Sequence, residues 1–150
     1  MQLDHKDQIS VSALGKKVGV VTSRFNQEIT QALLAEAKSE LLKAGVKTED
    51  CKFVSVAGAM EIPFALKKLA SSEKFDCLVA IGCVIKGETP HFDYVCKMAQ
   101  EGVLKVSLDH TIPIGFGVIT VNTLEQAKAR LHVGGEAVLA ALELAVTNFE

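Results

Sequence analysis

The 150-residue sequence has no excess of basic residues, because 16 Lys and Arg stand against 18 Asp and Glu and the formal net charge is -2. The basic residues are spread along the chain, which argues against a nucleic-acid surface. Hydrophobic residues make up 49% and charged residues 23% of the chain, as in ordinary soluble globular proteins. We expect residues 1–150 to form one domain with a substantial core.

Long apolar runs are also absent, and no stretch reaches the length of a transmembrane helix. The N-terminal MQLDHKDQIS has neither the basic flank nor the apolar stretch of a secretory signal. Internal repeats, low-complexity segments and linkers are missing as well. These absences predict a cytoplasmic protein.

Cysteine and histidine patterns typical of metal or redox sites are missing. No CxxC pair occurs, and the cysteines are Cys51, Cys77, Cys83 and Cys96. Most of them lie in apolar runs, so we expect buried, reduced thiols. Three histidines have no metal-ligand spacing with Cys or Glu, namely His5, His110 and His132. We therefore expect no metal site.

Four short apolar runs alternate along the chain with helix-like patterns. The runs are nearly continuous in hydrophobicity and rich in Val and Ile, and they lie at residues 17–23, 51–58, 75–82 and 112–121. Continuous apolar runs are typical of strands covered on both faces. The alternation predicts an α/β fold with three α/β/α layers, a four-stranded parallel sheet and the flavodoxin-like class.

Capping and breaking residues mark the expected helix ends. We expect Asn26 to be the N-cap and Gly45 the stop of the first helix, and Pro63 to lie near the start of the second. In the last helical region, Thr123 and Gln126 form a capping box pattern, and Gly134-Gly135 predicts a break before EAVLAALELAV.

Each expected strand leads into an unusual polar turn. The turns are SRFN at residues 23–26, AGAMEIP at 57–63, KGETPH at 86–91, and Asn122-Thr123 after the fourth strand. Ligands of parallel sheets bind beyond the carboxyl ends of the strands. We therefore expect residues of these turns to converge on one edge of the sheet.

The third turn has the features of an anion site. Thr89 is placed to be an N-cap and Pro90 to be the first helical residue, which leaves unpaired N–H groups that attract an anion such as phosphate. Gly87 would allow close backbone approach. The helix dipole would favour neutral His91, able to accept a proton, unless a bound phosphate reverses that bias. The alternative is an ordinary surface histidine in a first helical turn.

The segment GCVIKGET comes within one residue of a nucleotide phosphate-binding loop, GxxxxGK followed by Ser or Thr. Glu88 stands where the lysine must be, so an acid replaces the cation that contacts the phosphates. Cys83, Val84 and Ile85 also resemble a strand more than a loop. An NTPase is therefore disfavoured, and Gly115-Phe-Gly117 lies inside an expected strand and is no dinucleotide fingerprint.

Three further residues allow both a structural and a functional interpretation. Phe25 is placed either to staple the following helix or to stack on a flat heterocycle. Glu61 either complements a helix dipole or accepts hydrogen bonds from a polyol. Arg130, seven residues past Thr123 at the far end of that helix, is explained by dipole complementarity alone.

Four co-linear motifs closely resemble the 6,7-dimethyl-8-ribityllumazine synthase family of riboflavin biosynthesis. They are SRFN, AGAMEIPFA, IGCVIKGETPHFDYV and FGVITVNTLEQAKAR, and the resemblance covers nearly the whole chain. It implies condensation of 5-amino-6-(D-ribitylamino)uracil with 3,4-dihydroxy-2-butanone 4-phosphate, releasing phosphate and water, without metal or organic cofactor. Such chemistry needs proton transfer and orientation, which one histidine and an anion site can supply.

The resemblance also implies roles for individual residues. Phe25, beside Asn26, would stack on the pyrimidine. Three residues would hold the ribityl chain and ring, with hydroxyl hydrogen bonds to the glutamate, and these are Ala59, Met60 and Glu61. The ring pocket would be lined through the backbone of Cys83, Val84 and Ile85.

Phosphate and proton transfer are assigned by the same resemblance to the third turn. Gly87, Glu88 and Thr89 would lie beside the phosphate, and His91 would be the acid and base. The neighbouring subunit would supply Phe116 to the ring and Arg130, which the resemblance includes among the catalytic residues, to the phosphate. A site completed in this way implies a homo-oligomer, with the pentamer or its multiples as the expectation.

The chain departs from the family pattern in two places. Met60 stands where many members carry Phe, and the lysine of a glycine-rich loop between the last two helices is missing from LHVGGE. His132 is one candidate to replace that cation. The sequence leaves open a pentamer, a decamer or a sixty-subunit capsid, and association with a riboflavin synthase. The alternative function is a non-catalytic flavin- or lumazine-binding shell protein.

Overall fold

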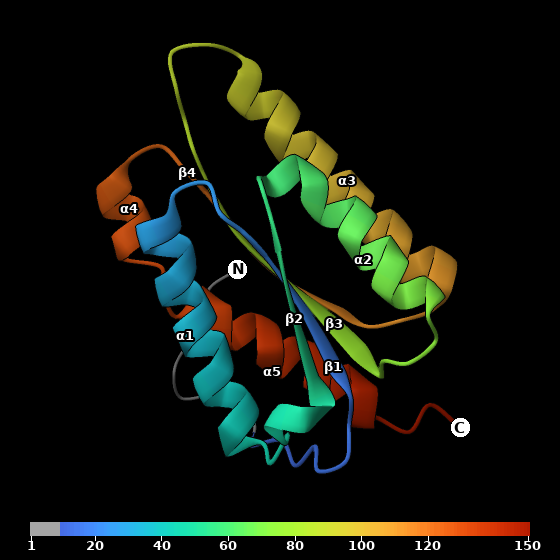
Figure 1. Cartoon of the computed structure of the whole chain (residues 1–150). Helices are drawn as coiled ribbons and strands as arrows, with labels where there is room; N and C mark the ends of the chain where they lie inside the picture. Colours follow the sequence, from blue (N-terminus) through green and yellow to red (C-terminus); the bar gives the residue numbers. More distant parts are fainter. Residues whose placement is uncertain (1–9) are drawn as a thin grey trace.

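The computed structural model describes residues 10–150, and a four-stranded parallel sheet lies at its centre (Figure 1). The strands follow the order β2-β1-β3-β4, and they are β1 (Val18–Ser23), β2 (Cys51–Val56), β3 (Cys77–Ile85) and β4 (Ile114–Val121). All three strand pairs are parallel. The predicted α/β class and flavodoxin-like fold are confirmed.

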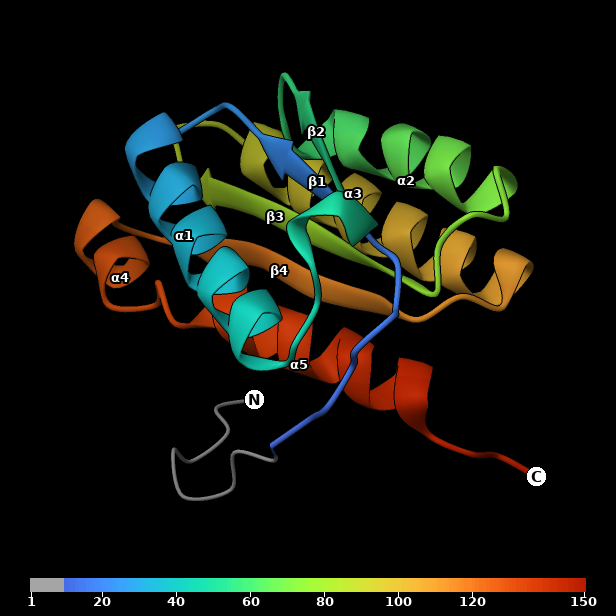
Figure 2. The same cartoon turned by 60° about the horizontal axis from the view of Figure 1, so that its bottom comes forward.

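Helices cover both faces of the sheet (Figures 1 and 2). One face carries α1 (Gln27–Lys43), α4 (Leu124–Lys128) and α5 (Val133–Val146). The other carries α2 (Ile62–Ser71) and α3 (His91–His110), which pack side by side. Two short 3₁₀ turns, η2 (Thr48–Asp50) and η3 (Ala59–Glu61), precede β2 and α2. The result is the expected three layers.

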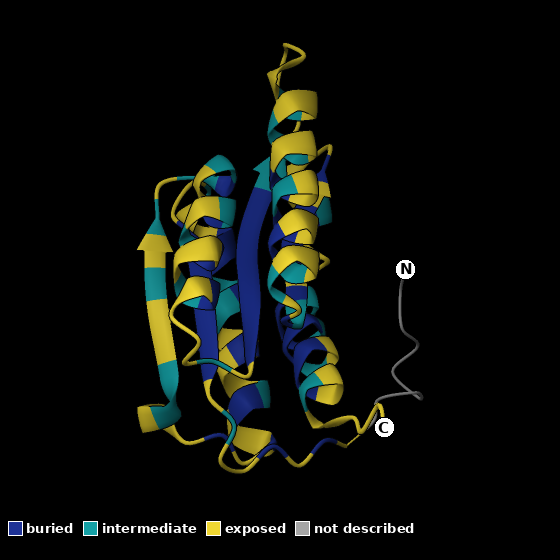
Figure 3. Ribbon diagram, turned by 90° about the vertical axis from the view of Figure 1, so that its right-hand side faces the viewer, coloured by how far each residue is buried: buried dark blue, intermediate teal, exposed yellow. Residues whose placement is uncertain are grey.

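Burial on both faces explains the continuous apolar runs. In β1, Val20 packs with α1 and α5, whereas the next residue, Val21, packs with α2 and α3. Successive strand side chains point to opposite faces, so both sets must be apolar. The edge strand β2 differs, because its residues are half-buried or exposed. Figure 3 shows the buried strands inside the molecule and exposed residues on the outer helix surfaces.

Most element ends lie within a few residues of the prediction. The helix α1 ends where Gly45 adopts a left-handed φ of 83°, and Gly45 and Val46 donate to the carbonyls of Leu42 and Leu41. This is a Schellman arrangement, for which glycine is favoured. The capping box of α4 is also confirmed, since Thr123 and Gln126 bond each other reciprocally.

One predicted helix end was correct in position but unusual in geometry, and one predicted break was wrong. Asn26 is the N-cap of α1, but its side chain makes no cap hydrogen bond and its backbone is left-handed, with φ 62° and ψ 51°. Gly134 and Gly135 do not break a helix, because they lie in the first turn of α5. A Cβ at Gly134 would overlap the backbone of Leu33 in α1, so glycine is needed there for close helix packing.

The prediction for Arg130 was also imprecise. The helix α4 ends at Lys128, and Arg130 lies in the turn that leads to α5. Its Nη1 donates to the carbonyl of Gln126 at 2.9 Å, so the guanidinium satisfies a carbonyl near the C-terminus of α4. The non-helical turn between α4 and α5 therefore lies before Gly134 and Gly135.

Candidate active site

The turns that follow β1, β2 and β3 meet at the carboxyl edge of the sheet. The backbone N–H of Phe25 donates to the carbonyl of Ala57 at 3.1 Å, which joins the first turn to the second. The Asn26 amide donates through Nδ2 to the carbonyl of Cys83 at 3.0 Å, which joins the first turn to β3. The expected convergence is thus confirmed for the first three turns, whereas Asn122 and Thr123 of the fourth turn do not line the cavity between them.

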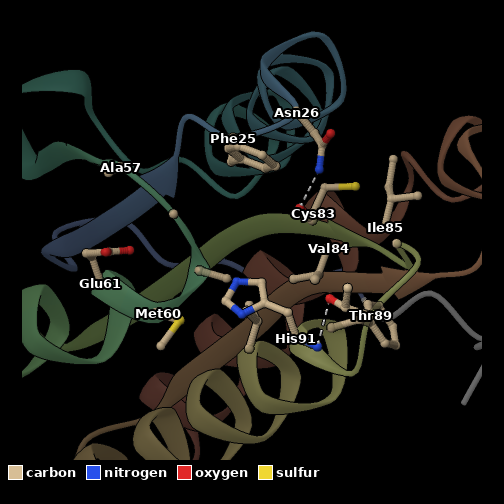
Figure 4. A pocket seen from close by; sticks show the side chains of 15 residues that line it. Phe25, Asn26, Ala57, Met60, Glu61, Cys83, Val84, Ile85, Thr89 and His91 are labelled. Atoms are coloured by element: carbon tan, nitrogen blue, oxygen red, sulfur yellow. Dashed lines mark hydrogen bonds between the residues drawn. The ribbon is translucent and has the colours of Figure 1, made fainter.

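A cavity of about 390 Å³ lies between these turns and the start of α3 (Figure 4). This volume is in the usual range for a small-molecule site. Eleven of the predicted substrate-binding and catalytic residues line it, namely Phe25, Asn26, Ala59, Met60, Glu61, Cys83, Val84, Ile85, Gly87, Thr89 and His91. The lining is largely apolar with a few polar groups, which suits a flat heterocycle with polar substituents.

His91 is the first residue of α3 and lines the cavity, and Figure 4 shows its ring beside Val84 and Met60. Pro90 already has helical backbone angles, and the Thr89 hydroxyl accepts a long hydrogen bond of 3.4 Å from the His91 N–H. The N-cap is thus Pro90 and not Thr89 as predicted, and the first helical residue is His91 and not Pro90, but the start of α3 does open into the cavity. The N–H groups of His91 and Asp93 already donate to the Thr89 hydroxyl and the Pro90 carbonyl, so the helix dipole is the feature that favours an anion at this position.

Phe25 stands at the mouth of the cavity with 74% of its surface exposed. A hydrophobic staple would pack the ring against the following helix. So exposed a ring contributes little to folding, and the structural interpretation of Phe25 is therefore disfavoured. An open aromatic face beside a cavity is suited to stacking on a planar ligand.

Glu61 and Met60 line the side of the cavity that lies across from Ile85 and Thr89 (Figure 4). Glu61 ends the η3 turn and caps α2 by position, but it makes no side-chain cap hydrogen bond. Its carboxylate lies close above Gly58, where an added Cβ would be 3.2 Å from Oε2. An exposed carboxylate at a cavity wall is available to accept hydrogen bonds from hydroxyl groups.

The end of β3 forms the floor of the cavity. Cys83, Val84 and Ile85 belong to this strand, so GCVIKGET is not a phosphate-binding loop and the NTPase interpretation is wrong. The Cys83 side chain is 3% exposed and packs in the core with α1 and α5 residues. Burial raises the pKa of this thiol to about 11, so it is protonated at neutral pH. It is therefore unsuited to nucleophilic catalysis.

Three predicted site residues lie outside the cavity lining. Glu88 is exposed in the turn before α3, and Phe116 is 40% exposed on β4. Arg130 is held against α4 by its bond to Gln126. Phe116 and Arg130 were predicted to act in a neighbouring subunit, so their role stays a prediction.

Four residues line the cavity that the sequence interpretation did not assign to it, namely Ala57, Gly58, Phe92 and Val95. The first pair belongs to the same AGAMEIP turn as three predicted residues, and its position there was an available signal. Phe92 and Val95 fitted the apolar stripe of the third helix. They are half-buried, which leaves part of each side chain free to line the cavity.

Residues 10–150 contain no group of three or more His, Cys, Asp or Glu placed to hold a metal ion. His5 lies outside the described residues. None of the helices in the described part of the chain is long and apolar enough to cross a membrane.

Comparison with known proteins places the same motifs in one family. A family model described as 6,7-dimethyl-8-ribityllumazine synthase matches residues 15–148. The chain is 44% identical over 133 residues to a protein of that name from Campylobacter jejuni subsp. doylei, covering 85% of this chain and 86% of the relative. It is 43% identical, with the same coverage, to the protein of that name from Campylobacter jejuni subsp. jejuni.

Proposed function

We propose that the cavity is the site of the reaction catalysed by the 6,7-dimethyl-8-ribityllumazine synthase family. This chain belongs to that family. The enzyme is a transferase that condenses 5-amino-6-(D-ribitylamino)uracil with 3,4-dihydroxy-2-butanone 4-phosphate, yielding the lumazine, phosphate and water. The observation that carries the proposal is the convergence of an exposed ring, a carboxylate and a histidine at a helix start on one cavity. We propose that residues 1–150 act as one synthase domain.

Substrate orientation is assigned to the three strand-end turns. Phe25 would stack on the pyrimidine, and its 74% exposed surface supports this role. Glu61 would accept hydrogen bonds from the ribityl hydroxyls, with Ala59 and Met60 beside the chain. The end of β3, Cys83–Ile85, would contact the ring through its backbone, because the Cys83 side chain is buried in the core.

Proton transfer is assigned to His91 at the start of α3. Forming an imine between an amine and a ketone, and expelling phosphate, requires protons to be removed and returned near one carbon skeleton. Gly87, Glu88 and Thr89 would border the phosphate, and the positive end of the α3 dipole would stabilise it. Holding both substrates in one cavity supplies the proximity that the condensation needs, so the proposal invokes no metal or organic cofactor.

A second copy of the chain would complete the site. Phe116 and Arg130 lie outside this cavity and are proposed to reach the ring and the phosphate of a neighbouring subunit. A ring of subunits follows, and we propose a pentamer or a multiple of it, including a capsid. We also propose association with a riboflavin synthase. The turn between α4 and α5 lacks a lysine, so Arg130 is the side-chain cation proposed for the phosphate, with His132 as the candidate for a second one.

We also propose a cytoplasmic location. All four cysteines lie among the described residues and none forms a disulfide. Reduced thiols are typical of proteins that work in a reducing compartment.

The direct test is turnover of the two substrates, followed by the fluorescence of the lumazine. His91→Ala is expected to slow turnover by a factor of about 10 to 1000, the usual contribution of one acid or base. His110→Ala is the matched control, because His110 ends the same helix and contacts Lys67 away from the cavity. An unchanged rate in His91→Ala would remove His91 from the mechanism.

The same assay separates the alternative, a non-catalytic flavin- or lumazine-binding shell protein. That alternative predicts tight binding of the lumazine without turnover at micromolar protein. The family assignment does not favour it. A histidine beside an anion site is also unnecessary in a protein that only binds.

A further inference from the structure

Strand pairing ends before the first turn reaches the cavity. The pairing of β1 with β3 ends at Thr22 and Ile81, although β3 continues to Ile85. The pairing of β1 with β2 ends at Ser23 and Val56. Beyond these residues, the part of β3 that lines the cavity has no ladder with the β1 side. The position of the first turn relative to β3 must therefore be set by other contacts.

Asn26 supplies such a contact. Its Nδ2 donates to the Cys83 carbonyl at 3.0 Å in a partly buried position, across 57 residues of sequence. This side-chain amide takes the place of a backbone donor at the end of the ladder (Figure 4). On the other side of the turn, the Arg24 and Phe25 N–H groups donate to the Ala57 carbonyl. Phe25 is thus held between one tether to the second turn and one to β3.

The backbone of Asn26 is adapted to this reach. An N-cap residue usually has extended angles, and its side chain accepts from the first helical turn. Asn26 instead is left-handed, with φ 62° and ψ 51°, and its side chain does not cap α1. Asparagine enters this region more readily than most residues. The local cap is replaced by a long-range bond, which indicates that the position of the turn matters more than the cap.

We propose that Asn26 is a positioning residue, whose amide holds the Phe25 ring at a set distance from the Cys83–Ile85 backbone across the cavity. Of the two tethers of the first turn, the Asn26 bond is the one that sets its distance from β3. The inference rests on the proposed function for the identity of the ligand. Asn26 acts on binding through Phe25 and takes no part in proton transfer.

Asn26→Gly separates the side-chain bond from the backbone, because glycine adopts the left-handed conformation without strain. The KM for the pyrimidine substrate is expected to rise about three- to tenfold, the equivalent of one hydrogen bond. The KM for the phosphate substrate should change less than about twofold, since the start of α3 is untouched. Asn26→Asp, which keeps the size but directs a carboxylate at the Cys83 carbonyl, should give at least as large a rise.

A double-mutant cycle with Phe25→Ala tests whether Asn26 acts through the ring. Without the ring, Asn26→Gly should change affinity for the lumazine, measured by its fluorescence, by less than about twofold. Glu73→Gly is the matched backbone control, because Glu73 is also left-handed, with φ 58°, and lies outside the cavity. It should leave both KM values unchanged.

Additive effects of Asn26→Gly and Phe25→Ala, or an equal rise of both KM values, would overturn the proposal in favour of a purely structural role. If the wild-type chain binds the lumazine but makes none, the proposed function fails. The cycle on lumazine affinity then still decides the role of Asn26. If Asn26→Gly does not fold, the same cycle with Asn26→Asp decides it.

Discussion

The two helical layers of this protein differ in how completely they cover the sheet. The layer of α1 and α5 encloses the larger buried cluster, and its helices approach so closely that Gly134 meets the backbone of Leu33. The layer of α2 and α3 buries fewer residues and leaves several large apolar side chains exposed, namely Phe64, Tyr94, Met98, Leu104 and Leu108. The cavity opens between the sheet edge and the second layer.

This difference separates two tasks within one fold. Close glycine packing makes the α1 and α5 layer a rigid support, in which an added methyl group has no space. The α2 and α3 layer carries His91 and Glu61, and its exposed apolar residues give it a surface suited to another copy of the chain. We infer that stability resides mostly in the first layer, whereas the site and the proposed assembly depend on the second.

The largest expected effect comes from placing a methyl group in each layer. Gly134→Ala should lower the free energy of unfolding by about 3 kcal/mol or more, because its Cβ would overlap the Leu33 carbonyl. Gly102→Ala in α3 brings its Cβ to 2.5 and 2.6 Å from Cγ and Cβ of the Pro63 ring, which must shift, whereas alanine favours the helix by about 1 kcal/mol over glycine. Its net loss should be smaller than that of Gly134→Ala, about 0 to 2 kcal/mol, because the gain in helix propensity offsets part of the overpacking. Urea unfolding measures both, and equal losses would contradict the comparison.

The next effect concerns the exposed surface of the second layer. Leu108→Glu should weaken self-association by about 2 kcal/mol for each subunit interface that buries this side chain. Leu108 is 69% exposed in the single chain and would become buried in the proposed oligomer. Leu42→Glu, with 67% exposure on α1, is the matched control. Light scattering at several concentrations should show dissociation for the first variant alone. Dissociation by Leu42→Glu alone would assign the interface to the other layer.

The smallest expected effect is a pH dependence of stability that originates in the first layer. Burial raises the pKa of Cys77 to about 12 from its ordinary value of 9.0, with a smaller contribution from Asp76. The folded state therefore keeps its proton while the unfolded thiol loses it. The resulting stability is complete below pH 9 and is lost as the pH rises toward 12, at about 1.4 kcal/mol per pH unit.

The measurement compares unfolding at pH 8 and pH 10. Cys77→Ala should reduce the loss of stability between these two values. Cys96→Ala in α3 should reduce it less, because Cys96 is only half-buried and its pKa is raised less strongly. The same slope in wild type and Cys77→Ala would show that other groups cause the loss.

The strands were predictable because their signal is local and repeated. Each buried parallel strand must be apolar on both faces, so a run such as residues 77–85 differs from a surface helix by composition alone. The convergence of the turns was also predictable, since parallel topology brings the carboxyl ends of the strands to one edge. Capping boxes depend on neighbours three residues apart, and the one at Thr123 was therefore correct.

The errors arose where a distant partner overrides a local preference. Asparagine is a residue type favoured at N-caps, but the Asn26 side-chain amide donates to the carbonyl of Cys83, 57 residues away. Glycine is a residue type that disfavours helices, but the close approach of the α1 backbone requires a residue without a side chain at Gly134. Phe92 and Val95 fit the apolar stripe of α3, and only the folded cavity distinguishes a residue that lines it from one that packs.

By itself, the sequence determined the α/β class, the four strands, the family and most of the residues that line the cavity, because burial patterns and strand-end turns depend on residues close together in the chain. Only the tertiary structure decided that Asn26 joins the first turn to β3, that the glycine pair lies within α5, and that the α1 and α5 layer encloses the larger buried cluster. Such contacts join segments far apart in the chain, and local preferences carry no information about which partner is present.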